Sequence, residues 1–195
     1  MNKIFYVFIG LILVSCDPTY IADSADPRLP HFSTVGRNAS GAYINDIPWR
    51  ASCGPSFSCD DQGLTYDAEN DYTELRFPEA PLILSADYNE DNGSAMQLIF
   101  RLRGDQRNLI RTASQDNTVS FSLNAETNTV ELSLSADFPL ENTRSTNGLG
   151  QLHFRYVEMM DSGRYIVAGT FGFVVDDETG YYKVRSGRFD FRFNF

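Results

Sequence analysis

Histidine is nearly absent from this chain. Among the 195 residues there are two, His31 and His153. So few histidines argue against a histidine-based catalytic triad and against a metal site with several histidine ligands. The sequence also lacks Gly-x-Ser-x-Gly, His-Glu-x-x-His and a phosphate-cradling glycine loop. These absences favour a protein that is not an enzyme, although a glycoside hydrolase needs only two carboxylates, and carboxylates are abundant here.

Positive charge and long apolar runs are also scarce. Lysine and arginine together number 16 against 26 acidic residues, which gives a formal net charge of −10. Such a surface repels phosphate backbones, so we expect no nucleic-acid partner. The apolar run Ile4–Val14 is shorter than the roughly twenty residues that a membrane-spanning helix needs.

The amino-terminal residues have the parts of a secretory signal: a basic start, a short apolar run and a small residue before Cys16. The tetrad LVSC at residues 13–16 resembles the lipobox of bacterial lipoproteins, which implies cleavage before Cys16 and attachment of diacylglycerol to its thiol. We therefore expect a signal peptide over residues 1–15. The mature protein would be lipid-anchored in the cell envelope, at the periplasmic or the surface face of the outer membrane, with the membrane as its partner.

The three cysteines can be assigned together. Once Cys16 carries lipid, Cys53 and Cys59 remain, and an exported location favours a disulfide bond between them. The alternative is a metal site, but two thiols at this spacing with no histidine nearby are a poor zinc motif.

Domain organisation follows from a change in pattern near residue 32. Residues 16–31 hold prolines and aspartates with few large apolar side chains, which predicts a lipidated cysteine followed by a flexible tether. From Phe32 onward, apolar and polar residues alternate in about eight to ten short segments separated by polar turns. We predict that residues 32–195 form one all-β domain, an antiparallel β-sandwich, with an open β-barrel as the alternative.

Three segments make more specific predictions. Residues 121–134 contain two alternating stretches around a polar turn and are predicted to form a hairpin. Residues 165–175 are apolar or small on both faces, which is typical of a central strand. Residues 42–49 predict a tight hairpin that carries Trp49 into the core, and Pro48 places its strand at an edge.

Two stretches of the sequence carry a resemblance to a known group: residues 41–49 (GAYINDIPW), and residues 169–173 (GTFGF) with residues 186–190 (SGRFD). The first is similar to the opening hairpin, and the second to the closing hairpin, of a group of Bacteroidota lipoproteins with small β-sandwich domains. The resemblance covers the two ends of the chain and leaves the middle unmatched. The resemblance implies a β-sandwich in the cell envelope and does not imply any particular activity.

One polar loop has some features of a calcium site. Asp87, Asn89 and Asp91 place oxygen ligands at alternate positions, as calcium loops do. The loop departs from the EF-hand pattern, because its glycine falls one place late and Leu98 stands where a bidentate glutamate belongs. We expect a polar turn with calcium binding as the alternative, and no other cofactor.

A possible ligand face combines basic residues from the outward sides of three strands: Arg101 and Arg103, His153 and Arg155, and Arg192. If these strands are neighbours, the face could bind an anion or an acidic glycan. If they are not, each arginine pairs with a cross-strand acid. We expect a binding or interaction module for a glycan or an envelope protein, because the predicted tether, the loop-rich sandwich and the lack of catalytic motifs together favour one. The alternatives are a structural component of an outer-membrane assembly and a hydrolase that uses loop carboxylates.

Overall fold

The computed structural model describes residues 22–52, 63–81, 95–124, 126–134, 144–145, 148–178 and 180–193. Within them lie twelve β-strands and one short helix, in this order: β1 (Ala39–Ile44), β2 (Ile47–Ser52), β3 (Gly63–Asp67), β4 (Tyr72–Arg76), β5 (Ala80–Pro81), β6 (Ala95–Arg103), α1 (Arg107–Ile110), β7 (Val119–Leu123), β8 (Asn128–Leu134), β9 (Arg144–Ser145), β10 (Leu149–Met159), β11 (Tyr165–Asp177) and β12 (Gly180–Phe193).

Several predicted sites fall outside these residues: Cys16, Cys53, Cys59, Asp87, Asn89 and Asp91. The predictions of lipidation, of a disulfide bond and of a calcium loop therefore stay predictions.

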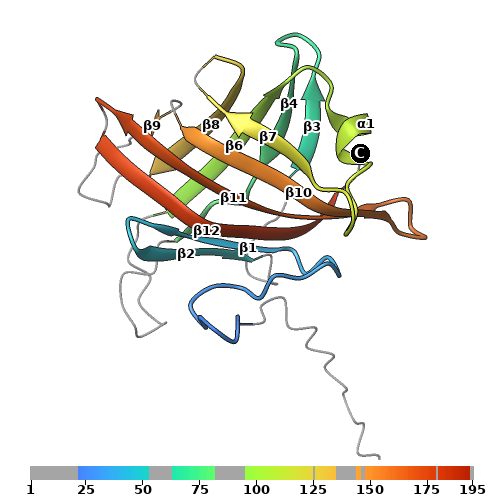
Figure 1. Cartoon of the computed structure of the whole chain (residues 1–195), viewed down its shortest axis with the longest axis horizontal. Coiled ribbons are helices and arrows are strands. Elements are labelled where there is room, and N and C mark those ends of the chain that lie inside the picture. The colour runs from blue at the N-terminus through green and yellow to red at the C-terminus, as the bar shows by residue number, and fades with distance from the viewer. Residues whose placement is uncertain are drawn as a thin grey trace, which may run out of the picture.

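The strands pair into two antiparallel sheets (Figure 1). We call the sheet with the order β2-β1-β12-β11-β10-β7 the β12 sheet, and the sheet with the order β3-β4-β6-β8-β9, to which β5 adds beside β6, the β6 sheet. Two separate antiparallel sheets confirm the predicted sandwich and not the open barrel. The described strands outnumber the eight to ten that we predicted, partly because β5 and β9 have two residues each and are too short to show alternation.

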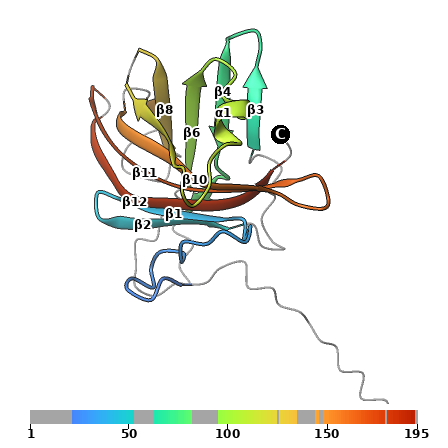
Figure 2. The same cartoon turned by 45° about the vertical axis from the view of Figure 1, so that its right-hand side comes forward.

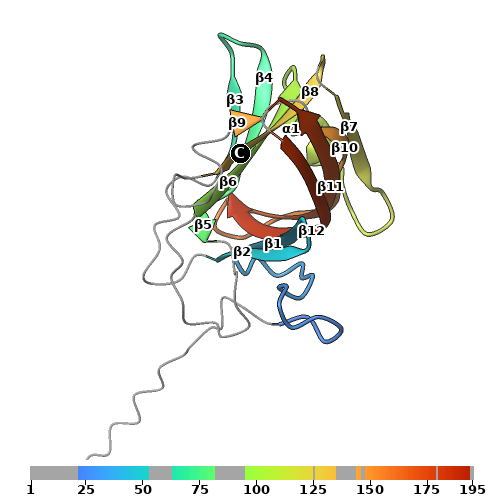
Figure 3. The ribbon, with the colours of Figure 1, turned by 90° about the vertical axis from the view of Figure 1, so that its left-hand side faces the viewer.

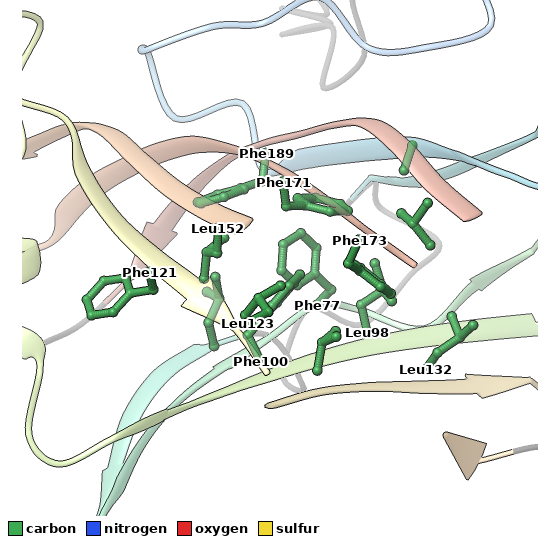
Figure 4. Close-up of a cluster of buried hydrophobic side chains, with 14 of the residues drawn as sticks. Phe77, Leu98, Phe100, Phe121, Leu123, Leu132, Leu152, Phe171, Phe173 and Phe189 are labelled. Atoms are coloured by element: carbon green, nitrogen blue, oxygen red, sulfur yellow. The ribbon is translucent and has the colours of Figure 1, made fainter. Parts of the chain in front are cut away.

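Buried apolar side chains, many of them aromatic, fill the space between the sheets. The two sheets lie on opposite sides of this space in Figure 3. Phe77 follows β4 and is fully buried, with its ring centroid 5.6 Å from that of Phe100 in the β6 sheet. It also lies 5.3 Å from Phe171 and 5.5 Å from Phe189 of the β12 sheet, both in T-shaped geometry (Figure 4). Edge-to-face contacts of this kind add to the stability gained by burying the rings. Phe77 therefore joins the two sheets.

The structure tests the three specific strand predictions. β11 lies between β12 and β10, as predicted for a central strand, and β2 with Pro48 lies at a sheet edge and carries the fully buried Trp49. The predicted hairpin over residues 121–134 is wrong, because β7 belongs to the β12 sheet and β8 to the β6 sheet. A tight connection does form, in which the Asn124 N–H donates to the Asn128 carbonyl. Either sheet buries its apolar face in the same core, so alternation alone does not assign a strand to a sheet.

Residues 22–31, predicted as part of the flexible tether, are folded. Leu29 is 1% exposed, Ala22 and Pro30 form an antiparallel bridge, and the Arg188 Nη1 donates to the Asp23 carboxylate at 2.6 Å. The tether prediction is therefore wrong for these residues, because composition does not reveal contacts with β12 far along the chain. We call residues 22–38 the strap; Figure 2 shows it beneath β1 and β12, on the outer face of the β12 sheet.

Substitution Phe77→Ala tests the role of this ring. We expect the free energy of unfolding to fall by about 3–5 kcal/mol, because the change leaves a cavity between both sheets. Phe121→Ala is the matched control, since Phe121 is 8% exposed at the border of the core and its ring contacts that of Phe154. Denaturant unfolding followed by Trp49 fluorescence measures both. Equal losses in the two variants would contradict the central position of Phe77.

Candidate functional site

A hollow of about 620 Å³ opens on the outer face of the β12 sheet. Its floor is formed by β10, β11 and β12, each of which pairs with a strand on both sides. The backbone of the floor is therefore largely satisfied within the sheet, and a ligand meets side chains. The lining residues are Phe32, Gly150, Gln151, His153, Arg155, Thr170, Phe171, Gly172, Ser186, Gly187 and Arg188.

A row of polar side chains crosses this face. The strand register places Ser120 opposite His153, His153 opposite Thr170, and Thr170 opposite Arg188. Leu152, which precedes His153, is buried in the core, as are sequence neighbours of the other residues in the row. Because successive side chains of a strand point to opposite faces, the row itself points outward. Directly opposed residues have Cβ atoms about 4.5–5.5 Å apart, so the sheet itself fixes the spacing of these polar groups.

Arg155 reaches the row from a β-bulge. Phe154 pairs with Gly169 and Tyr156 with Ala168, so Arg155 is the extra residue on β10 and has no opposing residue on β11. Its Nε donates to the Thr170 Oγ1 at 3.0 Å. Bulges often redirect a side chain, and here the bulge holds a guanidinium at the hollow.

His153 is held as a neutral ring. Its Nδ1 lies 2.8 Å from the Ser120 hydroxyl, and burial, followed by the charge of Arg155, lowers the pKa of His153 below 6.5. When Nδ1 accepts the Ser120 proton, Nε2 keeps the ring proton and can donate it to a ligand. The hollow thus offers a neutral donor beside a charged one.

Arg188 supplies a second guanidinium, and this one already binds a carboxylate. Its Nη1 donates to the Asp23 Oδ2 at 2.6 Å, and both side chains are 18% exposed. The backbone N–H of Ala25, and after it Arg188, hold the pKa of Asp23 below its usual range, so Asp23 is charged at neutral pH. Arg188 therefore already forms a guanidinium–carboxylate ion pair within the protein.

The structure divides the predicted basic face. His153 and Arg155 lie together in the hollow, whereas Arg101 and Arg103 lie on β6 in the other sheet. Arg192 lies on β12 but is bound to the strap, with its Nη2 donating to the Val35 carbonyl at 3.2 Å. The five residues do not form one face, because β6 belongs to the other sheet and β11 lies between β10 and β12. The condition for a common ligand face is therefore not met.

Arg101 forms the cross-strand ion pairs that we gave as the alternative. Its Nε donates to Glu74 at 3.1 Å and its Nη1 donates to Glu131 at 2.6 Å, on the outward side of the β6 sheet. Glu131 is 4% exposed, so removal of Arg101 would leave a buried carboxylate without this partner. We assign Arg101 a structural role. Arg103, on the same strand, lines a smaller hollow of about 390 Å³ with Tyr72 and Thr129.

Sequence reasoning missed Arg188, Thr170 and Ser120. Arg188 alternates with the buried Phe189, so its outward direction was visible in the sequence. The order of the strands was not visible, and that order is what brings β12, β11, β10 and β7 side by side.

Comparison of the chain with protein-family models, with curated proteins and with solved structures gave no match. The part of the chain that the structure describes contains no helix with the length and apolar character required to cross a bilayer. In the same part, no three histidine, cysteine or acidic side chains gather as metal ligands would. The side chains of the hollow are therefore the basis on which a function can be proposed.

Protonation of His153 should destabilise the fold. Because its pKa is lower in the folded than in the unfolded protein, the unfolded chain binds more protons in the window between those two values. Stability is therefore lost as the pH falls through that window, which begins near 6.5. We expect the melting temperature to drop from pH 7.5 to pH 5 by more in the wild type than in His153→Gln. An NMR titration that gives His153 a pKa of 6.5 or higher would contradict this environment.

Proposed function

We propose that this protein is a lipid-anchored envelope protein whose hollow binds a carboxylate group of an acidic glycan. The observation that carries the proposal is that Arg155, Arg188 and His153 line one hollow on a chain with a net charge of −10. A guanidinium presents parallel N–H donors that match the two oxygens of a carboxylate. A local basic site on an acidic protein also favours an anion at this site over the rest of the surface.

Several features support a glycan over a peptide. A peptide that pairs as an added strand needs a free sheet edge, and the strands below the hollow are internal. Gln151 and Ser186 offer polar groups for sugar hydroxyls, and Phe32 places an aromatic ring at the wall. Gly172 leaves open space at the floor of the hollow, because a Cβ at this position would contact only the Val184 carbonyl oxygen, at 3.5 Å. The hollow thus has an open, polar lining with one aromatic side.

The anchor belongs to the same proposal. The LVSC tetrad supports lipidation of Cys16 and a location in the cell envelope, and that location in turn supports a disulfide bond between Cys53 and Cys59. A lipid-held binding domain would keep its glycan close to the membrane surface.

The described residues give less support to the other two functions. Hydrogen bonds to their carboxylates lower the pKa of Asp23, Asp67 and Asp105, whereas a hydrolase needs a carboxyl group with a raised pKa as its acid. A structural component that packs on a membrane assembly would use a continuous apolar patch. Among the described residues, the exposed large apolar side chains are instead spread along the chain: Val35 in the strap, Leu109 in α1, Leu149 and Met159 at the two ends of β10, and Tyr181 in β12.

Binding should depend on the carboxylate and on Arg155. We expect trigalacturonate to bind the full-length chain in detergent, and its neutral counterpart galactotriose to bind at least tenfold more weakly. Arg155→Gln should weaken trigalacturonate binding by about 10–100-fold, because hydrogen bonds to charged groups contribute about 1.5–3 kcal/mol. Isothermal titration calorimetry measures both effects.

Arg103→Gln is the matched control, since it removes the same charge from the β6 sheet. It should leave the affinity within twofold of the wild type. Equal losses in the two variants would show only a general charge effect, and no binding of trigalacturonate would contradict the proposal. If an acetylated dipeptide binds and trigalacturonate does not, the carboxylate that the hollow recognises belongs to a peptide and not to a glycan.

The anchor has a test of its own. In cells that process lipoproteins, we expect the wild-type chain in the membrane fraction and labelled by an alkyne fatty acid. Cys16→Ser should abolish the label and release the domain from membranes, whereas Cys59→Ser should change neither. Retention of Cys16→Ser in the membrane fraction would contradict anchoring through this residue.

A further inference from the structure

Three successive outward-facing residues of β12, two positions apart in the sequence, bind the strap. Arg188 binds Asp23, Asp190 accepts the backbone N–H groups of Gly36 and Arg37, and Arg192 binds the Val35 carbonyl. Of these three β12 side chains, only Arg188 also lines the hollow. The strap and the ligand site therefore share one guanidinium.

The carboxy-terminal part of the strap is firmly fixed. The Asp190 carboxylate is 3% exposed and accepts the Gly36 N–H at 2.7 Å and the Arg37 N–H at 3.2 Å. Gly36 has a φ of +70°, and a Cβ at this position would lie 2.7 Å from the Arg192 Cγ. Removal of this part would leave a buried carboxylate without its donors, which is costly.

The amino-terminal part has a different kind of attachment. Asp23 closes a turn of its own, because its Oδ1 accepts the N–H groups of Ala25 and Asp26. The ion pair with Arg188 ties this turn to the hollow. Leu29 and Pro30 are buried, and Gly41 allows Pro30 to approach, since a Cβ on Gly41 would lie 2.5 Å from the Pro30 Cδ. Asp26 and Arg28 also contact β1, because the Tyr43 hydroxyl donates to the Asp26 carboxylate and the Arg28 guanidinium lies 5.2 Å from the Tyr43 ring centroid. Loss of the ion pair with Arg188 would therefore loosen residues 22–25 while residues 26–30 stay in place.

We infer that Asp23 is an internal competitor of the ligand: the glycan carboxylate replaces Asp23 on Arg188 and so loosens residues 22–25. This inference rests on the proposed function of the hollow. The exchange replaces one guanidinium–carboxylate pair with another, so little electrostatic energy is lost on Arg188. Because the strap lies between Cys16 and the domain, occupation of the hollow is coupled to the segment that leads to the proposed anchor.

Asp23→Asn tests the competition. The asparagine oxygen can still accept the N–H groups of Ala25 and Asp26, so the turn is kept while the charge that binds Arg188 is lost. We expect the affinity of the full-length chain for trigalacturonate to rise about two- to fivefold, the range for the loss of a competing surface ion pair. Asp46→Asn is the matched control. It removes the same charge from a pair with Arg185, at 2.8 Å, away from the hollow, and should leave the affinity unchanged.

Hydrogen–deuterium exchange of residues 22–25 tests the coupling. In the wild type, saturating trigalacturonate should speed exchange in this segment, although ligands usually slow it. In Asp23→Asn, exchange should already be faster without ligand, and trigalacturonate should add little.

The outcomes separate the inference from the proposed function. If the wild type binds trigalacturonate through Arg155 but Asp23→Asn binds no more tightly than Asp46→Asn, Asp23 is no competitor and the proposed function stands. If ligand slows exchange in residues 22–25, the strap closes on the ligand and the inference is overturned. If neither the wild type nor Asp23→Asn binds trigalacturonate, both proposals fail.

Discussion

The pairing of β12 between β1 and β11 is the constraint on which both the core and the site depend. Its inward positions supply Phe189, Phe191 and Phe193 to the core, and its outward positions supply Arg188 and Asp190 to the hollow and the strap. Because side chains alternate with a period of two, a slip of one residue would expose the phenylalanines and bury the charges. The burial of aromatic area that stabilises the sandwich therefore also aims the cations outward.

A site built on internal strands is pre-organised. The register fixes His153, Thr170 and Arg188 side by side, and the bulge on β10 fixes Arg155 against Thr170. Little order has to be gained on binding, except where Asp23 already occupies Arg188. The two arginines therefore differ. Arg155 is bonded to the neutral Thr170 hydroxyl, whereas Arg188 already binds the Asp23 carboxylate.

Alternation was sufficient to predict the fold class, the central position of β11 and the buried Trp49, because each depends on which side of a segment is apolar. It was insufficient wherever the answer depends on strand order. The partners of Arg101 lie 27 and 30 residues away, and the Asp23 partner of Arg188 lies 165 residues away. The pairings of Arg101 are set by the order of strands in the sheet, and the pairing of Arg188 by the path of the strap across β12. Local sequence pattern records neither.

The most direct test of this account is an NMR titration that follows the arginine Nε–Hε signals as trigalacturonate is added. We expect the signals of Arg155 and Arg188 to shift together and saturably, while those of Arg101 and Arg103 on the other sheet stay in place. Shifts confined to Arg101 and Arg103, or none at saturating ligand, would contradict the assignment of the hollow on the β12 sheet as a carboxylate-binding site.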